Sequence, residues 1–223
     1  MSVFDTVLNF IFPPTCPACK ESVENRGDWC QDCLMEHINF QRLTGDKILE
    51  QLVIGGCYAM AKYSGPAGEL IRNLKYKKKM ESEAGIHTFL NKALERPSVK
   101  KVILRCDVAV PIPLHEEKKK KRGFNQVELI FRDVLLKQGI AWSDCLLRMA
   151  NTKPQFGLKA EERKENLKSA FSIRDIKSVK GKDVLLVDDI MTTGTTIAKC
   201  ASILMQNGAN SVTALVFASD REK

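Results

Sequence analysis

The stretch that decides the fold is Val184–Thr196, VLLVDDIMTTGTT. Its first four residues are aliphatic, which is typical of a buried parallel strand. Asp188 and Asp189 follow at the expected carboxyl end of this strand, and four threonines then surround Gly194. We therefore expect a strand, a pair of carboxylates and a turn of small hydroxyl residues, in that order.

The residues that follow complete a strand–helix–strand unit. Apolar residues recur at i, i+3, i+4 and i+7 from Ile197 to Leu204, which predicts an amphipathic helix. Gly208 is placed to end that helix in the left-handed conformation, and Val212–Phe217 is a second apolar run of strand length. Ligands of open α/β sheets bind at the carboxyl ends of the strands, so the acids and the threonine turn are predicted to lie at a binding edge.

The threonine turn has the composition of a phosphate site. The first turn of a helix offers free N–H groups and the positive end of the helix dipole, and glycine lets the backbone approach a ligand. Two adjacent carboxylates can accept hydrogen bonds from neighbouring hydroxyls, such as those of a ribose. The alternative is an ordinary strand–turn–helix in which Asp and Thr only cap the helix. The residues of the predicted sugar-phosphate site are Asp188, Asp189, Thr192, Thr193, Gly194, Thr195 and Thr196.

Two CxxC pairs near the start predict a metal site. Two such turns bring four thiolates into the tetrahedral arrangement that suits Zn²⁺ and leave no open position for catalysis, so we expect a structural zinc. A redox CxxC or unrelated cysteines are the alternatives. The predicted ligands are Cys16, Cys19, Cys30 and Cys33. The isolated cysteines, for which we predict buried packing, are Cys57, Cys106, Cys145 and Cys200.

The chain is basic, with a formal net charge of +8 and a sequence pI of about 9.1, which favours acidic ligands such as phosphates, pyrophosphate or nucleic acid. A basic loop is expected at Lys118–Arg122, ahead of Gly123, between a strand that ends near Pro113 and a helix over Gln126–Leu136. Such a loop would line the same crevice as the threonine turn. We expect Lys118, Arg122 and Gly123 to meet a second phosphate group; the alternatives are a solvated surface or a nucleic-acid patch.

Two further charged segments are open to more than one interpretation. The polar stretch Asn151–Phe171 is predicted to be a loop that closes over a bound anion through Lys153, Lys159 and Arg163, or else to contain an ordinary surface helix. The cluster Lys75–Lys79 fits a solvated face and a phosphate contact equally well.

Four motifs together resemble the ComF family. They are the paired CxxC motifs, PLH…K…RGFNQ at residues 113–126, the QxxL…RxxN…AF pattern at residues 155–171, and VLLVDDIMTTGTT. The last is typical of phosphoribosyltransferases, and RGFNQ with the cysteine module narrows the resemblance to ComF. The resemblance extends from about Cys16 to the C-terminus. Lys118 departs from the pattern, since many members have an arginine there; the charge is kept and the bidentate fork is lost.

The resemblance implies a type I phosphoribosyltransferase fold, an α/β parallel sheet flanked by helices, with an N-terminal four-cysteine zinc module. It implies that 5-phosphoribosyl-1-pyrophosphate (PRPP) binds with Mg²⁺. Asp188 and Asp189 would hold the ribose hydroxyls, Thr192–Thr196 the 5′-phosphate, Lys118–Gly123 the pyrophosphate, and Asn151–Phe171 would form the lid. The family is associated with DNA uptake in competence, on the cytoplasmic side. Either the protein is a phosphoribosyltransferase with an unknown acceptor, or it is a non-catalytic protein of this fold that binds single-stranded DNA or competence proteins.

The order of the motifs predicts how the chain is divided. Few residues follow Val212–Phe217, so the hood over the sugar should come from residues before the core. We expect residues 1–50 to form a zinc-ribbon-like module and hood, packed beside the cleft, and residues 51–223 to form the phosphoribosyltransferase-like domain. A helix is expected over Phe40–Gln51. There is no apolar run of spanning length, and the cysteines occur without a secretion signal, so we expect a cytoplasmic protein without membrane insertion.

Overall fold

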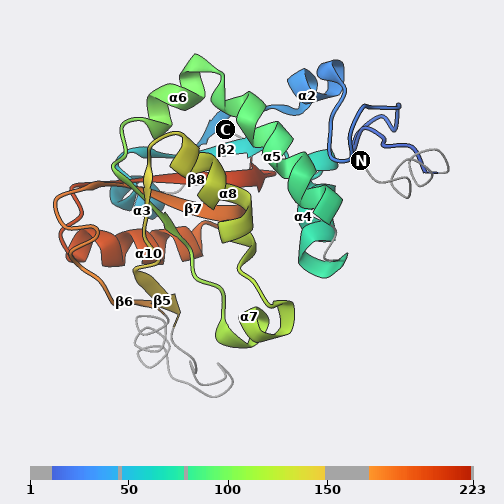
Figure 1. Ribbon diagram of the computed structural model, residues 1–223. Helices are drawn as coiled ribbons and strands as arrows, with labels where there is room; N and C mark the ends of the chain where they lie inside the picture. Colours follow the sequence, from blue (N-terminus) through green and yellow to red (C-terminus); the bar gives the residue numbers. More distant parts are fainter. Residues whose placement is uncertain (1–11, 45–46, 78–79, 149–170, 222–223) are drawn as a thin grey trace.

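The computed structural model describes residues 12–44, 47–77, 80–148 and 171–221. Its centre is a six-stranded sheet in the order β1-β2-β8-β7-β3-β4 (Figure 1). β1 runs antiparallel to β2, and all other neighbours in this sheet are parallel. A separate antiparallel ribbon consists of β5 (Leu146–Arg148) and β6 (Phe171–Ile173). The six main strands are β1 (Gln41–Leu43), β2 (Gly56–Ala61), β3 (Val108–Pro111), β4 (Ala141–Trp142), β7 (Asp183–Met191) and β8 (Ser211–Ser219).

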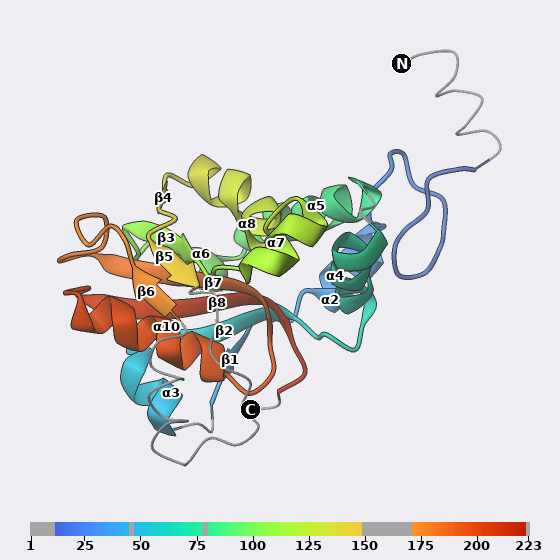
Figure 2. The same ribbon diagram turned by 90° about the horizontal axis from the view of Figure 1, so that it is seen from below.

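Helices cover both faces of the sheet (Figure 2). One face carries α4 (Pro66–Lys77), α5 (Met80–Leu94), α6 (Pro97–Ile103) and α8 (Gln126–Lys137), and the other carries α3 (Lys47–Leu52) and α10 (Thr195–Gln206). Each face therefore buries its own apolar cluster, and Phe89, Phe131 and Phe217 are fully buried in the first. Within the described ranges, none of the helices is long and apolar enough to cross a membrane.

β7 lies between β8 and β3, which explains why Val184–Val187 are all buried. The strand is longer than its apolar run predicts, because β8 continues beside it as far as the Met191–Ser219 pair. β3 instead ends at Pro111, opposite Val187. Beyond that point β7 has a paired neighbour on one side only, among the residues described. The sheet is therefore open on the β3 side where the two aspartates lie.

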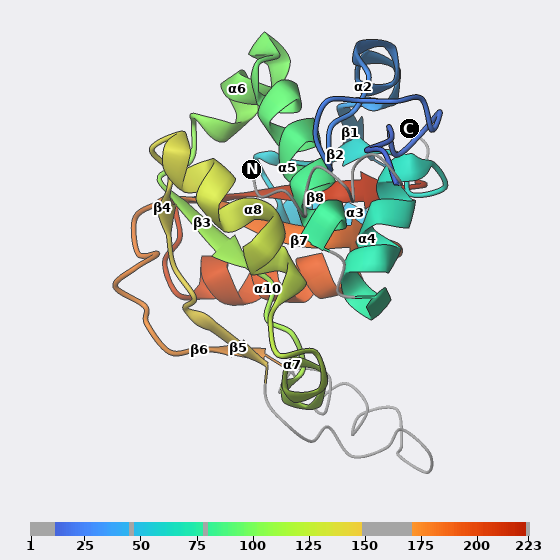
Figure 3. The ribbon, with the colours of Figure 1, turned by 45° about the vertical axis from the view of Figure 1, so that its right-hand side comes forward.

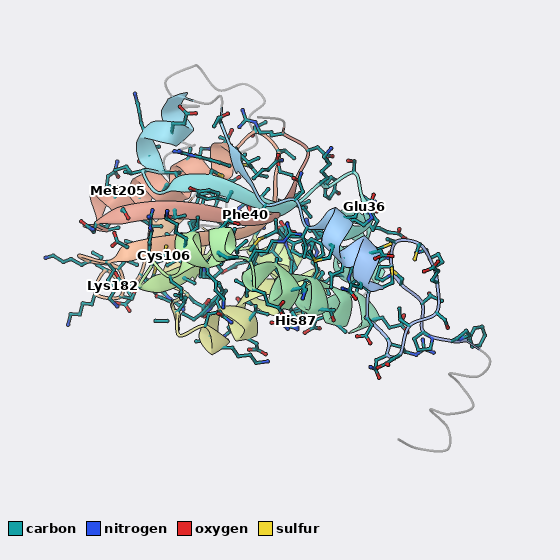
Figure 4. The ribbon with its side chains drawn as sticks, turned by 90° about the horizontal axis from the view of Figure 1, so that it is seen from above. Glu36, Phe40, His87, Cys106, Lys182 and Met205 are labelled. Atoms are coloured by element: carbon teal, nitrogen blue, oxygen red, sulfur yellow. The ribbon has the colours of Figure 1, made fainter. Side chains whose placement is uncertain are left out.

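The segment that leaves the cysteine module joins the sheet, so the helix expected over Phe40–Gln51 is wrong in its first half and present only from Lys47. Residues 41–43 form β1, and α3 begins at Lys47. The ring of Phe40, labelled in Figure 4, stacks on Tyr58 of β2 with centroids 5.2 Å apart. Leu43 is 3% exposed. Tertiary pairing with β2 has thus overridden the local helical pattern.

Gly68 lets α4 begin close to the turn after β2. A Cβ atom at this position would lie 1.7 Å from the carbonyl oxygen of Tyr63. We expect Gly68→Ala to lower the free energy of unfolding by about 1–3 kcal/mol, because the helix or the turn must shift. Gly65→Ala is the matched control, since its Cβ would make ordinary contact at 3.7 Å with the Lys62 oxygen. Equal urea midpoints for the two variants would contradict this packing.

Candidate functional site

The two aspartates lie side by side on the open end of β7. The N–H of Asp189 donates to Oδ1 of Asp188 at 2.9 Å, and the N–H of Ile190 donates to Oδ1 of Asp189 at 2.8 Å. Asp189 is buried, with 5% of its surface exposed. Burial raises the pKa of Asp188 well above its usual range; repulsion from the Asp189 carboxylate adds to the rise, and Lys75 opposes it.

Lys75 on α4 is the cation at this site, and sequence reasoning did not find it. Its Nζ forms an ion pair with Oδ2 of Asp189, and the two side chains are 12% and 7% exposed. Oδ2 accepts no hydrogen bond from a described residue, so the ammonium is its contact. The spacing of lysines in Lys75–Lys79 could not reveal this contact, because it depends on how α4 packs across the sheet.

The threonine turn follows the aspartates directly and opens α10. Gly194 is the N-cap residue, with φ of +80°, a left-handed conformation that favours glycine. The hydroxyls of Thr193 and Thr195 are 3.0 Å apart, and both residues are exposed. Thus the first turn of α10, with its N–H groups, faces the same end of β7 as the carboxylates.

The end of β8 supports this turn. The hydroxyl of Ser219 donates to the Met191 carbonyl at 2.9 Å, and a guanidinium N–H of Arg221 donates to the Thr193 carbonyl at 3.4 Å. The carboxylate of Asp220 accepts from the N–H of Ser64 at 2.7 Å, in the turn before α4. β8 therefore ties the threonine turn to the segment that carries Lys75. These contacts link distant parts of the chain and leave no signal in the sequence.

The expected basic loop is a helix, so that prediction is wrong in its local structure. α7 spans Glu116–Arg122 and therefore contains Lys118. Glu116 and Glu117 stand four residues before lysines, a spacing that favours a helix. Arg122 donates to Oε1 of Gln126 at 2.8 Å, and Gly123 has φ of +84° where the helix ends. α7 stands between α4 and the β5–β6 ribbon (Figure 3).

The four predicted zinc ligands come together. The Sγ atoms of Cys16, Cys19, Cys30 and Cys33 all lie within 4.8 Å of one another, and those of Cys19 and Cys30 are 3.7 Å apart. A tetrahedral zinc with Zn–S bonds of about 2.3 Å would place its sulfurs about 3.8 Å apart, so the cluster fits the ion. Burial raises the pKa of Cys16, but backbone hydrogen bonds at Cys30 and Cys19 lower it further, to about 7, whereas burial and hydrogen bonds with Cys30 and Cys19 raise the pKa of Cys33. Zinc binding must therefore release protons from this cluster.

The comparisons with known proteins agree with both halves of this geometry. Residues 135–223 match the family described as phosphoribosyl transferase domain, and residues 7–42 match the double zinc ribbon domain. The "DNA utilization protein YhgH" of Salmonella typhimurium is 30% identical over 198 residues, which are 88% of this chain and 80% of that protein. "Competence protein F" of Haemophilus influenzae is 25% identical over 206 residues, 89% of this chain and 82% of that protein.

This chain belongs to the ComF family. "Competence protein ComFC" of Bacillus subtilis is also similar, at 33% identity over 107 residues, 45% of this chain and 39% of that protein. The expected fold, an α/β phosphoribosyltransferase-like sheet with an N-terminal four-cysteine module, is confirmed. The structural zinc is supported by the zinc-ribbon match together with the cysteine cluster.

In this ComF protein the zinc module packs on α5 and on Arg96 at the start of α6. The indole N–H of Trp29 donates to the Gly85 carbonyl at 2.9 Å, and its ring lies 5.5 Å from that of Phe89. Arg96 donates to the carbonyls of Ile38 and Met35 at 2.9 and 3.1 Å. The module is thus held by specific contacts with α5 and with Arg96 of the main domain.

The other cysteines of the ComF chain are buried, as predicted. Burial raises the pKa of Cys57 to about 12 and that of Cys106 to about 11, which keeps both thiols protonated and unreactive. The four residues are Cys57, Cys106, Cys145 and Cys200.

The predicted lid lies almost wholly outside the described residues. Lys153, Lys159 and Arg163 all fall in the range 149–170, and of the segment Asn151–Phe171 only Phe171 is described. Phe171 pairs with Arg148, the last residue of β5, so the two described ends of the segment are adjacent.

Proposed function

We propose that this ComF protein binds PRPP together with Mg²⁺ at the open end of β7. The proposal rests on two groups of side chains that lie next to one another. They are the paired carboxylates of Asp188 and Asp189 and the exposed hydroxyls of Thr193 and Thr195 at the first turn of α10. The carboxylates suit ribose hydroxyls, and the helix start suits the 5′-phosphate. Both ends of a sugar phosphate are then held by adjacent residues of one strand–turn–helix.

The residues present also suit a divalent cation. Oδ2 of Asp189 is buried and forms an ion pair with the Lys75 ammonium, so a positive charge already lies beside this oxygen. Carboxylate oxygens are the ligands that Mg²⁺ prefers. When bound, Mg²⁺ would neutralise the charge of the pyrophosphate group. We further propose that Lys118, Arg122 and Gly123 meet the pyrophosphate and that Lys153, Lys159 and Arg163 cover the ligand.

We propose transfer of ribose phosphate to an acceptor, with release of pyrophosphate, as the reaction of this site. Displacement at the ribose C1 passes through an oxocarbenium-like state, which gains from residues that fix both ends of the sugar and exclude water. Asp188 and Asp189 would orient the ring through its hydroxyls, and the turn Thr192–Thr196 would fix the 5′-phosphate. The acceptor would enter from the hood side.

We also propose that residues 1–50 act as the hood, with help from α4. The zinc module contacts α5 through Trp29, and its Ile38 carbonyl accepts from Arg96 at the start of α6, while α4 places Lys75 at the acid pair. A cleft lined by His37, Asn39, Lys62 and Ser64 lies between the module and the turn before α4. An acceptor entering there would meet residues from both parts of the chain.

Titration calorimetry of PRPP tests the proposed function. We expect PRPP to bind zinc-loaded protein in millimolar Mg²⁺, and to bind at least about tenfold more weakly when Mg²⁺ is omitted, because the pyrophosphate charge is then uncompensated. Omission is preferable to EDTA, which would also remove the structural zinc. Ribose 5-phosphate, which lacks the pyrophosphate, is the control ligand, and its affinity should not depend on Mg²⁺ to this extent. No heat from PRPP with Mg²⁺ present would contradict the proposal.

A second function is a non-catalytic one, in which the same fold binds single-stranded DNA or competence proteins. It is favoured by the net charge of +8 and by the relatives' names, which refer to DNA utilization and competence. DNA binding through phosphates should weaken steeply with salt, with a logarithmic slope of about −0.7 per phosphate neutralised. Oligonucleotide binding that follows this slope, without Mg²⁺-dependent PRPP binding, would favour this second function.

A further inference from the structure

Lys75 and Asp189 form a pair inside the proposed ligand site. The partners come from elements far apart in the sequence, α4 and β7, and both side chains are largely buried. Oδ1 of Asp189 accepts a hydrogen bond from the N–H of Ile190. Lys75 contacts the other oxygen, Oδ2, which accepts no hydrogen bond from the described residues. The charged atom that a ligand or cation would need is therefore occupied by part of the protein.

The packing of α4 does not depend on this pair. Ala67, Ile71 and Leu74 on α4 are each no more than 2% exposed and belong to the main apolar cluster. Burying such apolar side chains stabilises the packing of the helix without the ion pair. Buried ion pairs, by contrast, gain little net stability, because each charge loses its hydration. A structural role for Lys75 alone therefore leaves its position unexplained.

The chemistry of the pair explains that position. Two adjacent carboxylates repel one another, and Asp188 and Asp189 are held together by the N–H of Asp189, which donates to Oδ1 of Asp188 at 2.9 Å. A positive charge must lie at the pair whenever both groups are ionised. In the free protein Lys75 supplies this charge from within the chain. A divalent cation, or the sugar of a ligand, would need the same oxygen.

We propose that Lys75 is an internal counter-ion that occupies the cation position on Asp189 in the free protein, and that the ion pair opens when a divalent cation or a bound sugar takes its place. The inference rests on the proposed function for the sugar, but the cation arm can be tested without PRPP. The Lys75–Asp189 ion pair keeps the free site from binding a divalent cation by itself, so that the metal binds together with PRPP.

Binding of Mn²⁺ alone, without PRPP, tests the proposal. We expect Lys75→Met to bind Mn²⁺ at least about tenfold more tightly than the native chain, since the competing ammonium is gone. Free Mn²⁺ is measured by electron paramagnetic resonance on zinc-loaded protein, with zinc content checked after titration. Titrations at pH 7 and pH 8.5 compare the variants at two proton concentrations, so that competition between protons and Mn²⁺ is seen as a change common to all of them. Arg72→Met is the matched control, because Arg72 is also a cation of α4 but its guanidinium lies over the Tyr63 ring, 5.2 Å from the centroid.

Further variants separate the counter-ion from a structural role. Lys75→Arg keeps the charge and should bind Mn²⁺ as weakly as the native chain, and Asp189→Asn added to Lys75→Met should abolish the gain. If Lys75→Met does not fold, Lys75→Gln carries the same expectation. Equal Mn²⁺ affinity in the native and uncharged variants would overturn the proposal. Absence of PRPP binding in every variant would contradict the proposed function and leave the Mn²⁺ result standing.

Discussion

Replacement of Cys33 by serine is expected to release the zinc ion and unfold the segment from Pro13 to Ile38. Zinc binding contributes about 10–16 kcal/mol to small zinc-dependent folds, and that is comparable to the stability of a whole domain. The apolar core of the module is small, with Trp29, Leu34 and Ile38 as its large buried aliphatic and aromatic side chains. Without the metal, so few contacts cannot offset the conformational entropy of the segment.

Trp29 reports this unfolding, because its indole is 6% exposed and packs on Phe89. The chain has two tryptophans, so the measurement uses a Trp142→Phe background. Loss of zinc should shift the emission of Trp29 to longer wavelength as the ring meets water. Cys106→Ala is the control, since this buried cysteine lies outside the zinc cluster and should leave both zinc content and emission unchanged. A Cys33→Ser protein with one zinc and a buried Trp29 would contradict the assignment.

The parts of the fold that sequence reasoning found are those with a local signature. Val184–Val187 must be a central strand because nothing but a doubly covered sheet buries four consecutive aliphatic residues of an extended chain. The helix that starts at Thr195 follows from its apolar period, and the cysteine cluster from the spacing of its members. In each case the residues that decide the structure are neighbours in the sequence.

The parts that sequence reasoning missed depend on contacts between distant residues. Residues 41–43 pair with β2, and Phe40 just before them stacks on Tyr58 of that strand. Lys75 looks like any lysine near a helix end until α4 is placed beside Asp189. The helix at Glu116–Arg122 is a different case, because its signature is local. Two glutamates stand four residues before lysines, and this spacing favours a helix over the loop that the run of lysines suggests.

Asp188→Asn and Asp189→Asn are both expected to weaken PRPP binding by more than about a hundredfold, and to change stability in opposite directions. Each substitution removes a carboxylate that accepts from a ribose hydroxyl, and hydrogen bonds to charged groups contribute about 1.5–3 kcal/mol. Each substitution also removes a negative charge that would hold the cation. The two losses of binding free energy together exceed the roughly 2.7 kcal/mol that corresponds to a hundredfold weaker affinity. Calorimetry with Mg²⁺ present measures this loss.

The stability of the Asp188 variant follows from the raised pKa of that carboxyl. A group whose pKa is higher in the folded state favours folding while it is protonated, and this contribution is lost as pH rises through the folded pKa. At pH 8, above the usual pKa of an aspartate, the native chain therefore pays either for a buried charge or for a proton taken up on folding, and asparagine removes this cost while its Oδ1 still accepts from the N–H of Asp189. We expect Tm at pH 8 to rise by about 2–4 °C, and the gain to disappear at pH 4.

The stability of the Asp189 variant should fall instead, because the substitution leaves the Lys75 ammonium buried beside a neutral amide. Breaking a buried pair by removing one partner costs about 3–5 kcal/mol, so Tm should drop by several degrees. Asp133→Asn on the exposed face of α8 is the control for a change of one charge, and should alter neither PRPP affinity nor Tm. If both site variants lost stability equally, or if either kept native PRPP affinity, the division of roles between the two aspartates would be wrong. Opposite shifts in Tm with a shared loss of PRPP binding require two different roles. The Asp189 carboxylate is balanced by Lys75, and the Asp188 carboxylate lowers the stability of the free protein but binds the ligand.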